Sequence, residues 1–148
     1  MSIYIRLVTG FAKRVKKKMD FTIDFTKEQI EAIENVLEEE LIELGVQSVI
    51  LMDLAGNVIV NLDSGGTSHD VFSLAALAAG NYGAVSAMAN IIGEQEFSLL
   101  FHKGEEESIH FSKVVDDLLL LTIFNKNVSL GFLRLKVAEA IKRIQLLV

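Results

Sequence analysis

The sequence contains no cysteine and lacks the common signatures of catalysis. Without thiols the chain forms no disulfide and performs no thiolate chemistry, which fits a reducing compartment, and we expect a cytoplasmic protein. No GxxxxGK[ST] phosphate-binding loop is present, and no serine lies in a nucleophile-elbow sequence. The histidines, at 69, 102 and 110, have no close metal-ligand spacing, although His102 and His110 are placed to meet across two predicted strands. We therefore expect no catalytic residue, no cofactor and no metal.

Long apolar runs and a uniform charge distribution are also missing. No apolar run approaches the roughly 18 to 20 residues of a membrane span, and the N-terminus lacks a signal-peptide pattern. The net charge is −6, but residues 1–18 carry six Lys/Arg and no acid, which leaves eight basic and twenty acidic residues in the remainder. An acidic body argues against binding of nucleic acid through its phosphates.

Residues 1–18 mix apolar and basic side chains, and the basic ones crowd into the run KRVKKK. A basic amphipathic segment of this kind can lie on an anionic membrane or contact a partner. The run MDFTIDFTKEQ from Met19 looks like a natural start, however, so we favour a dispensable extension. The sequence thus predicts a basic N-terminal extension over residues 1–25 and one domain over residues 26–148.

The first helix of the domain is predicted from its capping residues. Thr26 and Gln29 have the spacing of a capping box, and Phe25 and Ile30 have that of a hydrophobic staple. The helix should end at Gly45. Its apolar stripe is predicted to comprise Ile30, Ile33, Leu37, Leu41 and Leu44.

Five strands and two further helices follow in the pattern. The strands are predicted at 46–53, 58–62, 96–102, 108–114 and 118–124. A central helix over 72–92, with Ser68 or Asp70 as its N-cap, follows the second strand, and Ser129 caps the last helix. The run LLLLTIF has no alternation, so its strand should be covered on both faces and lie in the middle of the sheet.

This order predicts a single α/β domain of the α+β type, with the arrangement α-β-β-α-β-β-β-α. Hairpin connections make the five-stranded sheet antiparallel. Because the middle strand needs cover on both sides, we expect the first and last helices on one face and the central helix on the other.

The central helix carries no charged residue, which is unusual for a helix at a surface. Its predicted core face comprises Leu74, Leu77, Ala78, Val85, Met88 and Ile92. The opposite face comprises Phe72, Ala76, Ala79, Gly80, Gly83 and Ala87. Two glycines inside a helix are costly, by up to about 1 kcal/mol each, so they indicate close packing against another chain. The alternative is a central helix covered by its own domain.

Several runs resemble the Roadblock family, which includes the dynein-light-chain relatives. GVQSVILMDLAGNVIV opens the sheet and LLLLTIF, with SLGFLRLKVAEAIKRI, closes the domain, so the resemblance covers about residues 26–146. AGNYGAVSAMANIIGEQEF followed by LLFHKGEEESIHFS is similar to the bacterial gliding-motility regulators of this family. Members of that branch often carry a C-terminal extension, and this sequence departs from the pattern because it stops at Val148.

The resemblance implies a homodimer that binds a small Ras-like GTPase (MglA-like) and stimulates its GTP hydrolysis, in control of cell polarity or motility. Carried over by position, the platform comprises Ala76, Ala79, Gly80, Gly83 and Ala87, and the dimer seam on the third strand comprises Phe97, Leu99 and Phe101. A passive Roadblock scaffold and a small-molecule sensor are the alternatives. No arginine occurs between Gly45 and Leu133, so we expect activation by positioning, with Lys103 as the alternative cation supplied in trans.

Overall fold

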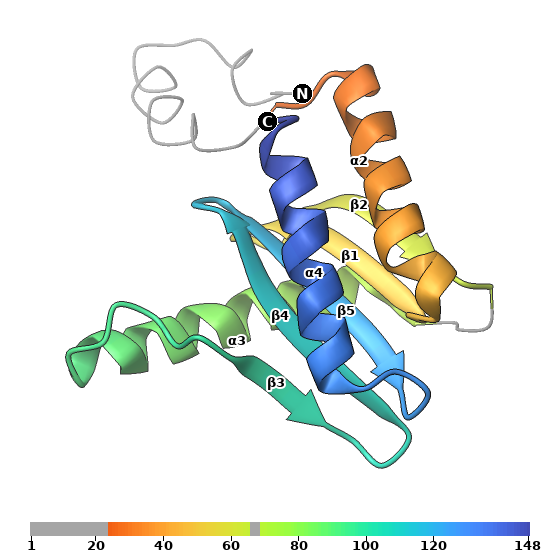
Figure 1. Ribbon diagram of the computed structural model, residues 1–148. Coiled ribbons are helices and arrows are strands. Elements are labelled where there is room, and N and C mark those ends of the chain that lie inside the picture. Colours follow the sequence, from red (N-terminus) through yellow and green to blue (C-terminus); the bar gives the residue numbers. More distant parts are fainter. Residues whose placement is uncertain (1–23, 66–68) are drawn as a thin grey trace, which may run out of the picture.

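The computed structural model describes residues 24–65 and 69–148, which form one sheet with helices on both faces (Figure 1). The helices are α2 (Lys27–Glu40), the short 3-10 helix η2 (Ile42–Leu44), α3 (Val71–Ile91) and α4 (Leu130–Gln145). The strands are β1 (Ser48–Asp53), β2 (Val58–Asp63), β3 (Leu100–Lys103), β4 (Glu107–Val115) and β5 (Leu118–Asn125). The predicted order of elements is confirmed. Most of the predicted extension, and the candidate cap Ser68, lie outside the described residues.

The helix ends follow the local signals in the sequence. The hydroxyl of Thr26 accepts a hydrogen bond from the backbone N–H of Gln29 at 3.1 Å, and the Gln29 side chain accepts one from the Thr26 N–H at 2.9 Å. The capping box is therefore confirmed. The α-helix itself ends at Glu40, earlier than predicted, and Gly45 ends the short η2 that follows, in the left-handed conformation with φ of 104°. Asp70 caps α3 and Ser129 caps α4 through their side chains.

The sheet is antiparallel with the strand order β2-β1-β5-β4-β3. β5 lies in the middle and is buried from Leu118 to Phe124, as the absence of alternation predicts. β3 is an edge strand, but it begins at Leu100, so the prediction that it starts at residue 96 is wrong. The ladder between β4 and β5 has an irregularity between Lys113 and Val115. A bulge there disrupts the pairing surface that residues 96–99 would need.

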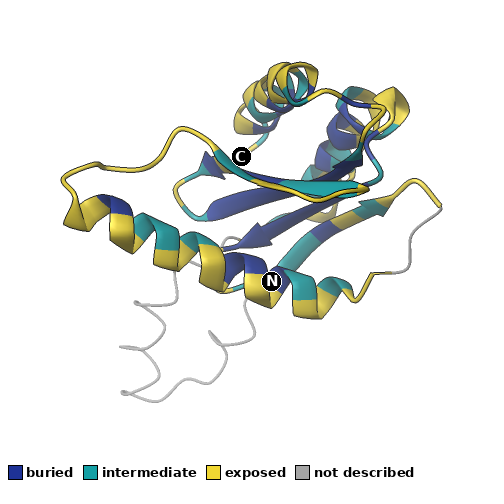
Figure 2. Ribbon diagram, turned by 90° about the horizontal axis from the view of Figure 1, so that it is seen from below, coloured by how far each residue is buried: buried dark blue, intermediate teal, exposed yellow. Residues whose placement is uncertain are grey.

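Two apolar cores lie on the two faces of the sheet. On one face α2 and α4 pack against β1 and β5, through residues such as Ile33, Leu37, Leu133 and Val137. On the other face α3 packs against Ile50, Met52, Leu119 and Leu121 through its alanines. Two helices on one face and one on the other were predicted, and the structure confirms this arrangement (Figure 2).

The predicted orientation of α3 about its own axis is partly wrong. Leu77, Met88 and Ile92, assigned to the core, are 71%, 54% and 68% exposed. Ala79, assigned to the outer face, is 8% exposed. The helix turns its small residues toward the sheet because it lies close to the backbone there. A Cβ added at Gly56, in the β1–β2 turn, would meet the Cα of Ala76 at 3.0 Å.

The C-terminal part of α3 projects past the edge of the sheet, and a connection returns from it to β3 (Figures 1 and 2). α3 is also the one helix among the described residues that is long and apolar enough to cross a membrane, with a hydropathy of 1.4. The expectation that no run approaches that length is therefore wrong. Because α3 packs against the sheet through Ala75, Ala78 and Tyr82, it is an integral element of the domain.

Candidate interaction surface

The outer face of α3 is apolar and uncovered along its whole length. Phe72, Leu77, Met88 and Ile91 are 77%, 71%, 54% and 84% exposed. We call this surface the α3 patch. It comprises the exposed residues Phe72, Ala76, Leu77, Gly80, Gly83, Ala84, Ala87, Met88 and Ile91. A contiguous apolar surface of this kind marks an interaction site in a folded domain.

The two glycines of the α3 patch have no packing role within residues 24–65 and 69–148. A Cβ added at Gly80 or at Gly83 meets nothing within 4 Å. Each glycine costs the helix about 1 kcal/mol relative to alanine. Since no described part of the chain approaches these positions, close packing against another molecule is the reason that fits them.

The apolar surface continues from α3 to the start of β3. Ile92, Phe97 and Leu99 are 68%, 38% and 40% exposed, and Phe97 and Leu99 lie ahead of the strand. The outer edge of β3 is not paired with any described strand. Such an edge can pair with a strand of another chain. Of the residues predicted for the seam, Phe97 and Leu99 are therefore exposed just ahead of the unpaired β3 edge.

Phe101 differs from its neighbours because its side chain lies on the opposite face of the sheet. Its ring stacks on that of Phe124, with 5.9 Å between the ring centroids, and it packs against the core formed by α2 and α4. The next residue, His102, lies on the α3 face, where its Nε2 is 3.4 Å from the Asn81 side-chain oxygen. Neighbouring positions of a strand point to opposite faces. Phe101 therefore packs β3 against the core formed by α2 and α4.

The same alternation separates His102 and His110, which the sequence would have allowed to meet across two strands. His110 pairs with Phe101 across the ladder, so it faces α4, whereas His102 faces α3. Burial, together with the charge of Arg134, lowers the pKa of His110 to about 4, and its ring is neutral above that pH. No cluster of three metal-ligating side chains occurs among the residues that the structure describes.

The only cation that borders the inner side of α3, within the described ranges, is Lys113. Its Nζ lies 3.5 Å from Glu96 and 3.7 Å from Asp116. Partial burial opposes the charge on Lys113, but Glu96 and Tyr82 outweigh that effect, and the pKa of Lys113 is raised. This lysine is therefore charged and already paired.

The arginines lie on the other face of the sheet, as predicted from their positions on the last helix. Arg143 donates hydrogen bonds to Glu39 and Glu40, each at 3.1 Å, and so joins α4 to α2. Arg134 lies on α4 near His110. No arginine in the described part of the chain reaches the α3 patch.

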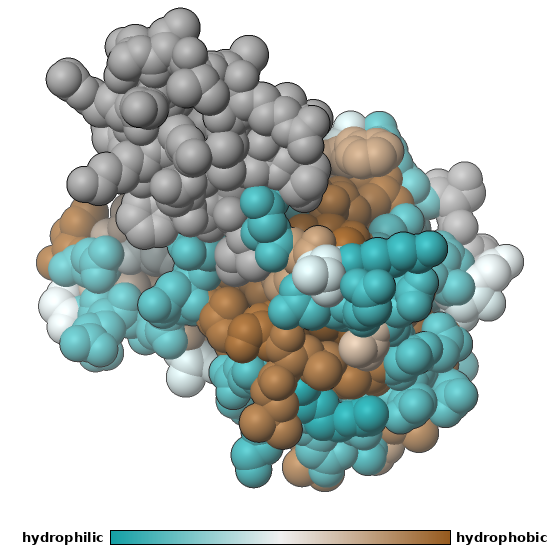
Figure 3. Space-filling model, turned by 90° about the horizontal axis from the view of Figure 1, so that it is seen from above, coloured by the Kyte–Doolittle hydropathy of each residue, from teal (hydrophilic) through white to brown (hydrophobic). Residues whose placement is uncertain are grey.

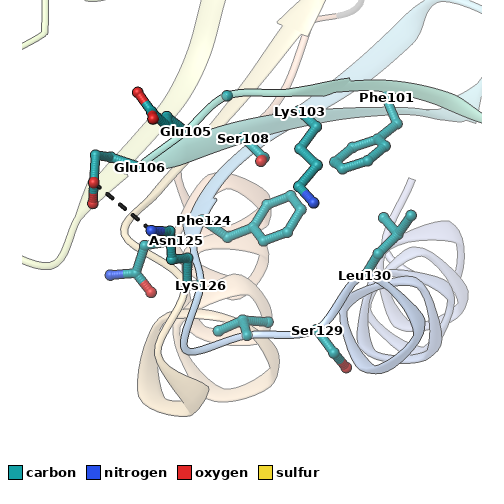
Figure 4. Close-up of a pocket in the computed structure, with 12 residues that line it drawn as sticks. Phe101, Lys103, Glu105, Glu106, Ser108, Phe124, Asn125, Lys126, Ser129 and Leu130 are labelled. Carbon is teal, nitrogen blue, oxygen red and sulfur yellow. Dashed lines mark ion pairs between the residues drawn. The ribbon is translucent and has the colours of Figure 1, made fainter.

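Lys103 lies beside a cavity of about 470 Å³ on the side of the sheet that carries α4 (Figure 4). The rings of Phe101 and Phe124 form its apolar wall, and an ion pair of 3.8 Å joins Lys126 to Glu106 at its rim. Lys103 thus lies on the face opposite the α3 patch, which weakens the alternative that Lys103 acts in trans on a GTPase bound at that patch.

A five-stranded antiparallel sheet with paired helices on one face and a single apolar helix on the other defines a Roadblock-type domain, and such domains are generally non-catalytic and regulatory. The chain belongs to the Roadblock/LC7 domain family, whose pattern matches residues 32–124. The family predicted from the sequence is therefore confirmed.

Solved structures similar to this chain include bacterial MglB proteins. The gliding protein MglB from Thermus thermophilus is 26% identical, with a TM-score of 0.77, over 85% of this chain and 95% of that one. Myxococcus xanthus MglB is 30% identical, with a TM-score of 0.75, over 85% and 97% of the two chains. An MglB structure described as having a tetrameric arrangement is 26% identical, with a TM-score of 0.79 over 85% and 94%. A comparison with curated proteins finds no match.

Proposed function

We propose that this chain is a homodimeric regulator of a small Ras-like GTPase of the MglA type, and that it stimulates GTP hydrolysis by that partner. It acts in the cytoplasm, in the control of cell polarity or motility. The observation that carries the proposal is the α3 patch, an apolar helix face with two glycines at which an added Cβ would meet nothing in the described part of the chain. The likeness to MglB structures supports it.

Pairing of two copies would use the α3 patch and the β3 edge together. The patch has no charged residue, so pairing of the two α3 faces brings no like charges together, and the exposed acids Glu94 and Glu96 lie beyond it, in the connection to β3. Gly80 and Gly83, one turn apart, allow the backbones of two helices to approach closely. The unpaired edge of β3 adds backbone hydrogen bonds to the same contact. Phe97 and Leu99, beside that edge, are covered in the pair.

The route of activation follows from where the cations lie. An arginine supplied in trans accelerates hydrolysis by neutralising transition-state charge. Arg134 and Arg143 are on the far face, and Arg143 is held by two carboxylates. We therefore propose that the dimer holds the switch segments and catalytic residues of the GTPase in place, which is a positioning effect.

A passive scaffold is the second candidate, and the same distribution of cations favours it. A domain with no free cation near its binding surface can hold a GTPase without changing the rate of hydrolysis. Binding with an unchanged rate would select this candidate. Binding with acceleration would select the regulator.

The test is single-turnover GTP hydrolysis by an MglA-type GTPase at saturating concentrations of this protein. We expect acceleration by the wild type and nearly the same rate with Lys103→Ala, Arg134→Ala and Arg143→Ala. A hundredfold loss in any one of these variants, with binding intact, would refute positioning. The Lys113→Ala variant serves as the matched control, because Lys113 is already paired with Glu96.

A further inference from the structure

A groove separates α2 from α4 on the face of the domain opposite the α3 patch. It has a volume of about 410 Å³ and is bordered by residues of both helices. Its lining comprises Ala32, Asn35, Val36, Glu39, Arg143, Leu146 and Leu147. Figure 3 looks onto the end of the domain where α2 begins and α4 ends, and apolar surface is visible there between hydrophilic areas.

The apolar side of this groove extends to the end of the chain. Leu146 is 87% exposed and Val148 is 45% exposed, whereas Leu147 between them packs on the core. The backbone oxygen of Leu147 accepts a hydrogen bond from the Gln29 side chain at 2.9 Å, which holds this end of the chain beside the first turns of α2. The exposed leucine and valine therefore lie at a fixed place.

The α2 side of the groove is strongly acidic. Residues 27–44 contain seven glutamates and one lysine, which gives them a net charge of −6. Arg143 pairs with Glu39 and Glu40. The carboxylates of Glu28, Glu31 and Glu38 have no cation within 4.0 Å among the described residues, and all three side chains are exposed.

The segment with the complementary composition enters the domain at the same place. Residues 1–18 carry a charge of +6 from Lys and Arg, together with Ile3, Leu7 and Phe11. The basic cluster at 13–18 precedes Asp24 by six to eleven residues, which span roughly 20 to 40 Å when extended. α2 has 14 residues and is about 21 Å long. The basic cluster can therefore reach every glutamate along α2.

We propose that residues 1–18 dock on the α2–α4 groove of their own chain. Their lysines and arginines lie along the glutamates of α2, and their apolar side chains cover Leu146 and Val148. The charges of residues 1–18 and of residues 27–44 are equal and opposite, and the connection is short enough to keep the local concentration of the segment high. This docking does not depend on GTPase regulation, because the groove between α2 and α4 shares no residue with the α3 patch. Docking leaves the basic segment bound to the domain and unavailable to an anionic membrane.

The test uses a spin label, since the chain has no cysteine of its own. A nitroxide on Ala12→Cys in the full-length protein should broaden the amide NMR signals of Ala32, Asn35 and Leu146. The signals of Gly80 and Gly83, on the other face, should stay sharp. The broadening should disappear in 1 M salt, where the Debye length falls to about 3 Å.

A matched pair of charge variants separates docking from general electrostatics. The triple variant Glu28→Gln, Glu31→Gln, Glu38→Gln should lose the broadening. The control Glu94→Gln, Glu105→Gln, Asp117→Asn changes the net charge equally and should keep it. The proposal is overturned by equal loss in both variants. It is also overturned if broadening is absent, or if it appears only between a labelled chain and a separate ¹⁵N-enriched chain. Binding to phosphatidylserine-containing vesicles without such broadening would assign the segment to membranes and overturn it too.

Discussion

Replacing both glycines of the α3 patch with alanine separates the chain's own stability from its pairing. Each Gly→Ala change inside a helix favours the helix by about 1 kcal/mol. Neither added Cβ meets an atom within 4 Å, so the structure of the single chain opposes neither gain. Together Gly80→Ala and Gly83→Ala should stabilise the single chain by roughly 2 kcal/mol. That free energy corresponds to roughly thirtyfold in the folding equilibrium.

Pairing should respond in the opposite direction. If two α3 helices meet at these glycines, two added methyl groups on each helix push the backbones apart and remove contacts from both partners. We expect the dimer dissociation constant, measured by sedimentation equilibrium, to rise at least tenfold, while urea unfolding at low concentration shows the gain in stability. Gly131→Ala on α4, where an added Cβ also meets nothing, is the control and should leave dimerisation unchanged. A stabilised double variant with an unchanged dissociation constant would show that these glycines do not lie at the interface.

Two further predictions concern His110 and residues 1–18. The pKa of His110 is about 4 in the folded chain, and the ordinary histidine value of 6.5 applies in the unfolded chain. The unfolded chain therefore binds more protons between these two pH values. As the pH drops through that window, the free energy of unfolding falls by up to roughly 3 kcal/mol. Urea unfolding of His110→Leu should show a weaker loss between pH 6.5 and 4.5, and parallel curves for the two proteins would contradict this. A chain that starts at Met19 should unfold cooperatively, with a midpoint within a few degrees of the full chain, because the capping box at Thr26 begins the domain. A midpoint lower by many degrees would place residues 1–18 within the core.

Local signals predicted the parts of the fold in which neighbours along the chain decide the outcome. The capping box of Thr26 and Gln29 needs only four residues of sequence, and the structure has both of its hydrogen bonds. The run from Leu118 to Phe124 has no polar alternation, and it lies in the middle of the sheet. In these places propensity and burial favour the same structure.

The sequence failed where the spacing between elements decides the outcome. The helical period of the large apolar residues suggested that Leu77 and Met88 face the core, but α3 lies close to the sheet and turns its alanines inward. The close backbone contact between Gly56 and Ala76 fixes the distance of α3 from the sheet, and the sequence of α3 alone does not indicate this contact. The predicted seam likewise relied on a third strand that was predicted to be longer than β3 is. Because side chains alternate along β3, Phe101 lies on the face of the sheet opposite α3. The platform residues Gly80, Gly83 and Ala87 are exposed, and their role in binding stays a prediction.

The central claim is that the α3 patch is covered by a second copy of this chain, and the molar mass in solution tests it most directly. Light scattering at micromolar concentration, without any partner, should give twice the mass of a single chain for the wild type and for the control Gly131→Arg. The Gly83→Arg variant, which places a charged side chain where two backbones should nearly touch, should give the mass of one folded chain. A wild type that is monomeric under these conditions, or a Gly83→Arg variant that remains a dimer, would contradict the claim.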